Sequence, residues 1–205
     1  MTEIYRLQGT VRTAVRSDAE MKQIDKAAAD LAFKKQKKRL DAFLKEKGFV
    51  KYKTNSYLHR NRIDVLEYID LQKEQYGSKT ATVNYALIPL YVPHRFLSFA
   101  LGGRLGKLVC DRDVWWDYAD DTIAALSFDS IMQAIDQILL PWFAEMASEK
   151  SIRQELIKEE IKRKRYGGRL SDIQQLWLDA LDQHMDSGET ISENMEVLKL
   201  PAGIR

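Results

Sequence analysis

The sequence predicts an α+β fold, in which a mainly antiparallel β-sheet of four to six strands packs against long helices. Helical patterning over residues 18–47 ends at Gly48, a residue type that suits the left-handed conformation at helix C-termini. Residues 63–91 then hold two runs of β-branched and aromatic residues around a short polar segment, which is typical of a β-hairpin. Helical periodicity returns near residue 120. This order of periods favours helices packed on an antiparallel sheet.

Length and composition fit a soluble globular protein. The chain has 205 residues, of which 45% are hydrophobic and 30% charged, enough for one sizeable core. It has no apolar run of the roughly 20 residues that cross a bilayer, no apolar signal core and a single cysteine. We therefore expect a cytoplasmic protein without membrane contact. We expect an α+β core over residues 1–149 and a C-terminal helical extension, packed on or near that core, over residues 150–205.

The first predicted helix begins at a capping box, residues 17–20 (SDAE), and carries a basic run at residues 34–39 (KKQKKR). We interpret this run as a solvated helix face. The alternative is a phosphate-contacting stripe of a nucleic-acid-binding protein, which would need the second basic run, residues 162–165 (KRKR), on the same face of the molecule. Residues 49–60 follow as a first hairpin.

The hairpin at residues 63–91 is predicted to form the centre of the sheet. Apolar residues occupy both parities of its second strand, so we expect this strand to be covered on both faces. Gln72 and Asn84 lie on the two facing strands and can be neighbours. If a small polar ligand binds, we expect it near Gln72, Asn84, Arg104 and Trp116. The alternative is that both amides satisfy backbone groups inside the sheet.

Residues 94–117 have no clear period. Residues 102–106 (GGRLG) match neither the dinucleotide-binding fingerprint nor the P-loop, and we favour a turn over a phosphate-binding loop there. Trp115 and Trp116 follow on an extended segment. Because neighbouring side chains of an extended chain point to opposite sides, we expect one tryptophan in the core and the other on a binding surface or under the next helix.

The clearest helix is predicted over residues 128–147, where an apolar stripe follows the helical period. Pro141 lies inside it and should remove the hydrogen bond to the Gln137 carbonyl and kink the helix. A helical pair is predicted over residues 151–185. Its first helix has Ile152, Leu156 and Ile161 inward. Its second opens with a capping box at residues 171–174 (SDIQ) and has one apolar side, made of Ile173, Leu176, Trp177, Leu181 and His184.

The acidic tail after Gly188 is expected to be partly mobile, or tied down only by Val197, Leu198 and Leu200.

The net charge of +2 conceals a strong segregation of charge. Residues 1–109 carry 21 basic and 11 acidic side chains, whereas residues 110–149 carry one basic and nine acidic side chains. One interpretation is that oppositely charged segments face each other in the fold. The other is that the acidic segment faces a basic partner protein. In that case the candidate partner-binding residues are Asp113, Asp117, Asp120 and Asp121.

The sequence contains no recognisable catalytic or metal-binding constellation. Its three histidines are dispersed, and no Cys–His or Cys–Cys cluster has the spacing of a zinc site. No nucleophile-elbow, zinc-protease or kinase motif occurs. We therefore predict no catalytic residues, no metal and no cofactor.

Over about residues 31–150 the chain resembles the bacterial domain-of-unknown-function family DUF4304. The matching segments are residues 43–49, Tyr57, residues 69–73, Tyr76 with Gly77, residues 82–84, residues 104–106, Trp115 with Trp116, and residues 140–143. The resemblance implies an α+β fold in which a sheet packs on helices. It implies no activity, because the family has none assigned, and residues 150–205 look like an addition outside it.

Three classes of function follow from these patterns. The leading hypothesis is a cytosolic, non-enzymatic protein-interaction module of the immunity or antitoxin kind, which blocks a basic effector protein. The second is a nucleic-acid-binding protein that uses the two basic runs. The third is a small-ligand-binding domain or an enzyme whose site is assembled from scattered residues.

Overall fold

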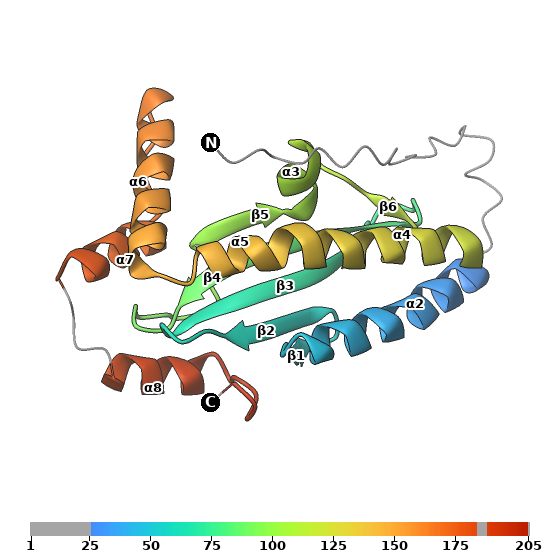
Figure 1. Cartoon of the computed structure of the whole chain (residues 1–205), viewed down its shortest axis with the longest axis horizontal. Coiled ribbons are helices and arrows are strands. Elements are labelled where there is room, and N and C mark those ends of the chain that lie inside the picture. Colours follow the sequence, from blue (N-terminus) through green and yellow to red (C-terminus); the bar gives the residue numbers. More distant parts are fainter. Residues whose placement is uncertain (1–25, 184–187, 205) are drawn as a thin grey trace.

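The computed structural model describes residues 26–183 and 188–204. They form the predicted α+β fold, a mainly antiparallel sheet with helices against it (Figure 1). The strand order is β1-β2-β3-β4-β5, and β6 pairs with the other end of β4. The strands are β1 (Val50–Lys53), β2 (Ser56–Arg60), β3 (Val65–Lys73), β4 (Thr80–Pro89), β5 (Leu101–Arg104) and β6 (Trp116–Asp117).

The first four strands form the antiparallel meander that the alternating pattern predicts, and β4 lies inside the sheet. The segment around residues 102–106 is not a turn as predicted. Leu101, Gly102 and Gly103 belong to β5, and the short helix α3 (Leu105–Cys110) follows directly. The sequence hides this strand because its two central residues have no side chains to show a period.

One face of the sheet, here called the first face, is covered by α2 (Lys26–Glu46) and by the helix that runs beside it in Figure 1. Phe33, Leu40 and Leu44 of α2 belong to the main apolar core. Helix α2 ends before Gly48, whose φ of +88° is the left-handed conformation expected at that position. The predicted start of this helix at residue 18 and its capping box lie outside the described residues.

The second covering helix is one continuous element with a π-helical centre. It comprises α4 (Asp121–Ala134), the π-helix Ile135–Leu139 and α5 (Leu140–Glu145). It begins at Asp121 rather than at residue 128 as predicted, because the Asp120 side chain caps it by accepting a bond from the Ile123 amide. The Leu140 amide donates to the carbonyl of Ile135, five residues back, so the wide π-turn accommodates Pro141 just after it.

The continuous segment Asp121–Glu145 is long and apolar enough, by length and composition alone, to cross a membrane. Within the described chain, however, Phe128, Ile131 and Ile135 are buried in the main core. We therefore assign this helix to the core of the fold.

Helices α6 (Glu149–Arg165) and α7 (Asp172–Gln183) form the predicted C-terminal pair. Ile152, Leu156 and Trp177 are fully buried in the same core as the first face of the sheet. Two predicted inward residues are exposed instead, Ile161 and Leu176. Ile161 lies five residues after Leu156, a spacing that turns it away from the buried stripe. His184 lies outside the described residues.

The opposite, second face of the sheet is partly covered by α8 (Gly188–Val197) and by the chain that follows it. Leu198, Leu200 and Ile204 pack there in a second apolar cluster, whose buried strand residues are Leu58, Leu66, Tyr68, Ala86 and Ile88. The tail is therefore a docked helix rather than a segment held by three apolar side chains, and Val197 is exposed.

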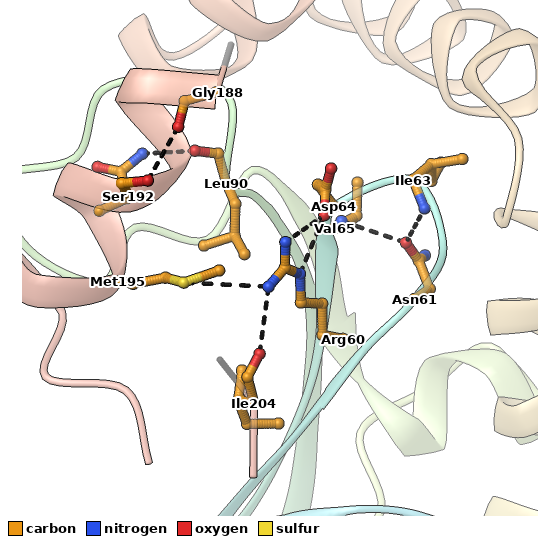
Figure 2. Close-up of polar contacts among 11 residues, drawn as sticks. Arg60, Asn61, Ile63, Asp64, Val65, Leu90, Gly188, Ser192, Met195 and Ile204 are labelled. Carbon is orange, nitrogen blue, oxygen red and sulfur yellow. Dashed lines mark hydrogen bonds and ion pairs between the residues drawn. The ribbon is translucent and has the colours of Figure 1, made fainter. Parts of the chain in front are cut away.

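Polar contacts fix α8 and the chain after it to the loop that follows β4 and to Arg60 of β2. Asn194 donates to the carbonyls of Leu90 and Val92 and accepts from the amide of His94. Figure 2 shows the Arg60 guanidinium between Asp64, Met195 and the Ile204 carbonyl. These bonds involve residues that sequence periodicity does not distinguish from ordinary polar positions.

Candidate ligand-binding cleft

A row of polar side chains crosses the second face of the sheet beyond the part that α8 covers. Ser56 pairs with Asp70, Asp70 with Asn84, and Asn84 with Arg104, so the row runs in register through β2, β3, β4 and β5. Because residues paired across strands point to the same face, all four side chains lie together. The row places a carboxylate, an amide and a guanidinium on one surface.

Asp70 is the hydrogen-bonding centre of this row. Its Oδ1 accepts from the Ser56 hydroxyl at 2.8 Å, and its Oδ2 accepts from the Asn84 amide at 3.4 Å. The same Asn84 amide nitrogen donates to Gln72 Oε1 at 3.0 Å. Tyr68 donates to the Ser56 hydroxyl at 3.2 Å, and burial raises the pKa of Tyr68. Within residues 26–183 and 188–204, the groups that donate hydrogen bonds to Asp70 are therefore neutral.

The row opens into a cleft of about 760 Å³ beside β5, a size typical of ligand pockets. The cleft reaches both faces of the sheet around the edge strand, because Gly102 and Gly103 present no side chains there. Its walls come from β3, β4 and β5, from the loop before β5, from α3 and α5, from α6, and from the start of α7. The residues that line the cleft include Tyr68, Asp70, Asn84, Tyr85, Phe99, Gly102, Gly103, Arg104, Trp142, Glu155, Glu159, Lys162, Arg163 and Gln174.

On the first face, the cleft is bounded by Tyr85 and Trp142, whose rings contact edge-on at 5.0 Å between centroids. Trp142 belongs to α5, directly after the π-helix and Pro141. Burial, and after it the charge of Glu155, raises the pKa of Tyr85 to about 12. Glu155 therefore lies close enough to the phenol for its charge to disfavour the phenolate.

Helix α7 is fixed to the cleft by Gln174. Its Nε2 donates to the Ala100 carbonyl at 2.8 Å, and its Oε1 accepts from the amide and hydroxyl of Ser171. The amide–carboxamide bond is one half of the predicted capping box. Gln174 of the capping box thus also binds Ala100, the residue directly before β5.

The structure brings together three of the four predicted ligand residues. Gln72, Asn84 and Arg104 lie on the second face, and Asn84 and Arg104 line the cleft. Trp116 lies apart from them, because it pairs with Ala81 on the first face, where it is buried and donates to Ser130. Arg104 lies instead over the ring of Trp115, at 5.1 Å.

Sequence reasoning missed Asp70, Phe99 and Glu155. The alternation in β3 carries a signal for Asp70, since Asp70 and Gln72 interrupt an apolar strand at the same parity. No local pattern marks Phe99 or Glu155, because they come from a loop and from a helix outside the strands.

The four candidate partner-binding aspartates all have partners within the chain. Asp113 pairs with Arg104, and Asp121 pairs with Lys35 at 2.6 Å. Asp117 accepts from the amide of Ala119, and Asp120 caps α4. Two further ion pairs join α2 and the residue that follows it to the acidic segment, Arg39–Asp129 at 2.7 Å and Lys47–Asp136 at 2.5 Å. These contacts favour the interpretation that oppositely charged segments face each other.

The basic runs are also engaged within the chain. Lys37 is mostly buried and donates to Asp41 and to the Tyr57 hydroxyl. In the second run, Arg163 pairs with Glu159 and Lys164 with Glu160. Helices α2 and α6 lie at opposite ends of the view in Figure 1, so the two runs do not form one basic face. Among residues 26–183 and 188–204, no group of three or more His, Cys, Asp or Glu side chains could hold a metal ion.

Glu155→Gln is expected to lower the pKa of Tyr85 from about 12 while leaving it above its ordinary value, because the burial remains. A raised tyrosine pKa stabilises the fold below the unfolded pKa of about 10, and this stabilisation is lost as the pH rises through the folded pKa. Phenolate absorbance in an alkaline titration, corrected with Tyr85→Phe, measures the shift. The matched control is Glu160→Gln, which lies on the same helix but does not line the cleft. Equal Tyr85 titrations in the two variants would contradict the proximity of Glu155.

A family model described as a domain of unknown function, DUF4304, matches residues 40–145. The matched region contains all six strands and the helix with the π-turn, whereas α6, α7 and α8 follow it. Comparison with curated proteins and with solved structures gives no match.

Proposed function

Because this chain belongs to the DUF4304 family, a domain of unknown function, we propose its function from its own geometry: it is a non-enzymatic, cytosolic protein-interaction module whose partner binds at the cleft beside β5. An immunity-like or antitoxin-like role, in which the module blocks an effector protein, is one function of this kind. The observation that carries the proposal is an open cleft with exposed aromatic side chains on, or directly following, the segments that form its walls.

Three aromatic residues near the cleft are largely open to solvent. Phe99 lines the cleft and is 54% exposed, and Phe96 in the same loop is 70% exposed. Tyr166 is 81% exposed and follows Lys162 and Arg163 by one helical turn. Exposed aromatic side chains around a concave surface are typical of protein-binding sites. A small molecule would contact only the walls of the pocket, whereas a protein would also cover the exposed aromatic rings outside them.

The test is affinity capture with the full chain from its native cell, comparing wild type with Phe99→Ser. The matched control is Tyr76→Ser, since Tyr76 is 96% exposed at the β3–β4 turn and does not line the cleft. We expect a protein that wild type and Tyr76→Ser capture and that Phe99→Ser loses.

Two outcomes would contradict the proposal. Binding that survives Phe99→Ser but is lost in Asp121→Lys would place the partner on the acidic segment instead of the cleft. Capture of nucleic acid, released when Lys35 and Lys38 are neutralised, would replace the module with a nucleic-acid-binding function.

A further inference from the structure

The cleft contains two similar arrangements, one on each face of the sheet. On the second face, the rings of Tyr68 and Phe99 lie 4.9 Å apart beside the Asp70 carboxylate. On the first face, the rings of Tyr85 and Trp142 lie 5.0 Å apart beside Glu155. Gly102 and Gly103 separate the two arrangements without filling the space between them. Each arrangement thus combines a carboxylate with an aromatic pair, the chemistry that binds organic cations.

The charged side chains of the cleft differ in whether they have a partner of opposite charge. Arg104 is held by Asp113 and lies over Trp115, and Arg163 is held by Glu159 at 2.7 Å. Lys162 lies 3.9 Å from the same Glu159. Among the described residues, Asp70 by contrast has no cationic partner: it accepts hydrogen bonds from the neutral groups of Ser56 and Asn84 and lies beside the neutral phenol of Tyr68. Glu155 pairs with Lys158, which is largely exposed and can exchange this contact for water or a ligand.

Next to Asp70 an anionic ligand is disfavoured, because Arg104, the neighbouring cation of the polar row, is already paired with Asp113. A cationic ligand would give Asp70 a charged partner, which none of the described residues supplies. A guanidinium group suits this position best, since its planar face stacks on an exposed ring such as Phe99 and its N–H groups donate to a carboxylate in fixed directions.

We propose that the cleft binds arginine side chains of a basic partner segment, with Asp70 and Glu155 as the charged anchors and the two aromatic pairs as walls. This inference rests on the proposed function and names the chemistry of the partner. The segment crosses the edge of β5 at Gly102 and Gly103, where backbone and ligand can approach closely.

The test measures binding of N-acetyl-arginine amide to the full chain by NMR titration. N-acetyl-citrulline amide is the matched probe, because it has nearly the same shape without the charge. We expect the arginine probe to shift the amide signals of β4 and β5 and the citrulline probe to bind at least about tenfold more weakly, since a charge-assisted bond is lost.

Single substitutions then test whether Asp70 and Glu155 bind the arginine probe. Asp70→Asn and Glu155→Gln are each expected to weaken the arginine probe severalfold, and Glu160→Gln, outside the cleft on the same helix, is expected to leave it unchanged. Glu155→Gln keeps the test valid if Asp70→Asn disturbs the sheet. Equal binding of both probes, stronger binding of N-acetyl-glutamate amide, or arginine binding that neither anchor variant weakens would each overturn the proposal.

The two proposals can fail separately. If capture depends on Phe99 but the arginine probe does not displace the captured protein, the module stands and the arginine anchor is wrong. If the arginine probe binds through Asp70 and Glu155 but no protein is captured, the cleft is a site for a small organic cation and the interaction module is wrong.

Discussion

Gly102→Ala is expected to destabilise the protein by about 2–5 kcal/mol and to detach β5 from β4. Gly102 has a φ of +155°, and a Cβ added there would lie 2.2 Å from the Tyr85 carbonyl oxygen and 2.7 Å from the Ala86 Cα. Both of these atoms belong to the backbone of the neighbouring strand and cannot move aside without breaking the ladder. Chemical denaturation measures the loss, and hydrogen exchange at β5 shows whether the strand separates.

Gly103→Ala is the matched control. The added Cβ would lie 3.6 Å from the Tyr85 hydroxyl, an ordinary van der Waals contact, and we expect a change within about 1 kcal/mol. Because β5 forms the floor of the cleft, Gly102→Ala should also remove binding at the cleft. Equal stability of the two variants would show that β5 can move away from β4 at little cost.

Asn194→Ala is expected to cost on the order of 3 kcal/mol, because it leaves the buried carbonyls of Leu90 and Val92 and the amide of His94 without their partner. Asn194 is almost fully buried, so water cannot replace these bonds while α8 stays docked. We expect helix α8 to undock in this variant, because undocking exposes the three unpaired backbone groups to water and so limits the loss of stability. Hydrogen exchange at the His94 amide and chemical denaturation measure the two effects.

Ser192→Ala is the control on the same helix. The Ser192 hydroxyl is exposed and donates to the Gly188 carbonyl one turn earlier (Figure 2). Its loss should change stability by no more than about 0.5 kcal/mol. Unchanged exchange at His94 in Asn194→Ala would mean that the apolar contacts of Leu198 and Leu200 alone hold the tail.

Strand periodicity predicts which strand residues of the candidate site can be neighbours, but it does not predict which tryptophan joins them. The pairing of Gln72 with the Asn84 region could be predicted, because two long alternating strands with a short turn have few possible registers. Which tryptophan joins the site could not be predicted. Alternation sends Trp115 and Trp116 to opposite sides, but only the pairing of Trp116 with Ala81 decides which of them enters the core.

The helix–sheet–helix order, the meander, the glycine end of α2 and the segregation of charge can all be predicted from the order of the amino acids. Each of these features depends on the spacing of apolar or charged residues along the chain, or on the backbone conformations that one residue, such as Gly48, can adopt. Only packing brings acidic and basic segments together in pairs such as Lys35–Asp121, lays α8 on part of the second face, and places Phe99 and Glu155 in the same cleft as Asp70. These contacts join residues far apart in sequence, and such contacts depend on how the elements pack rather than on any local pattern.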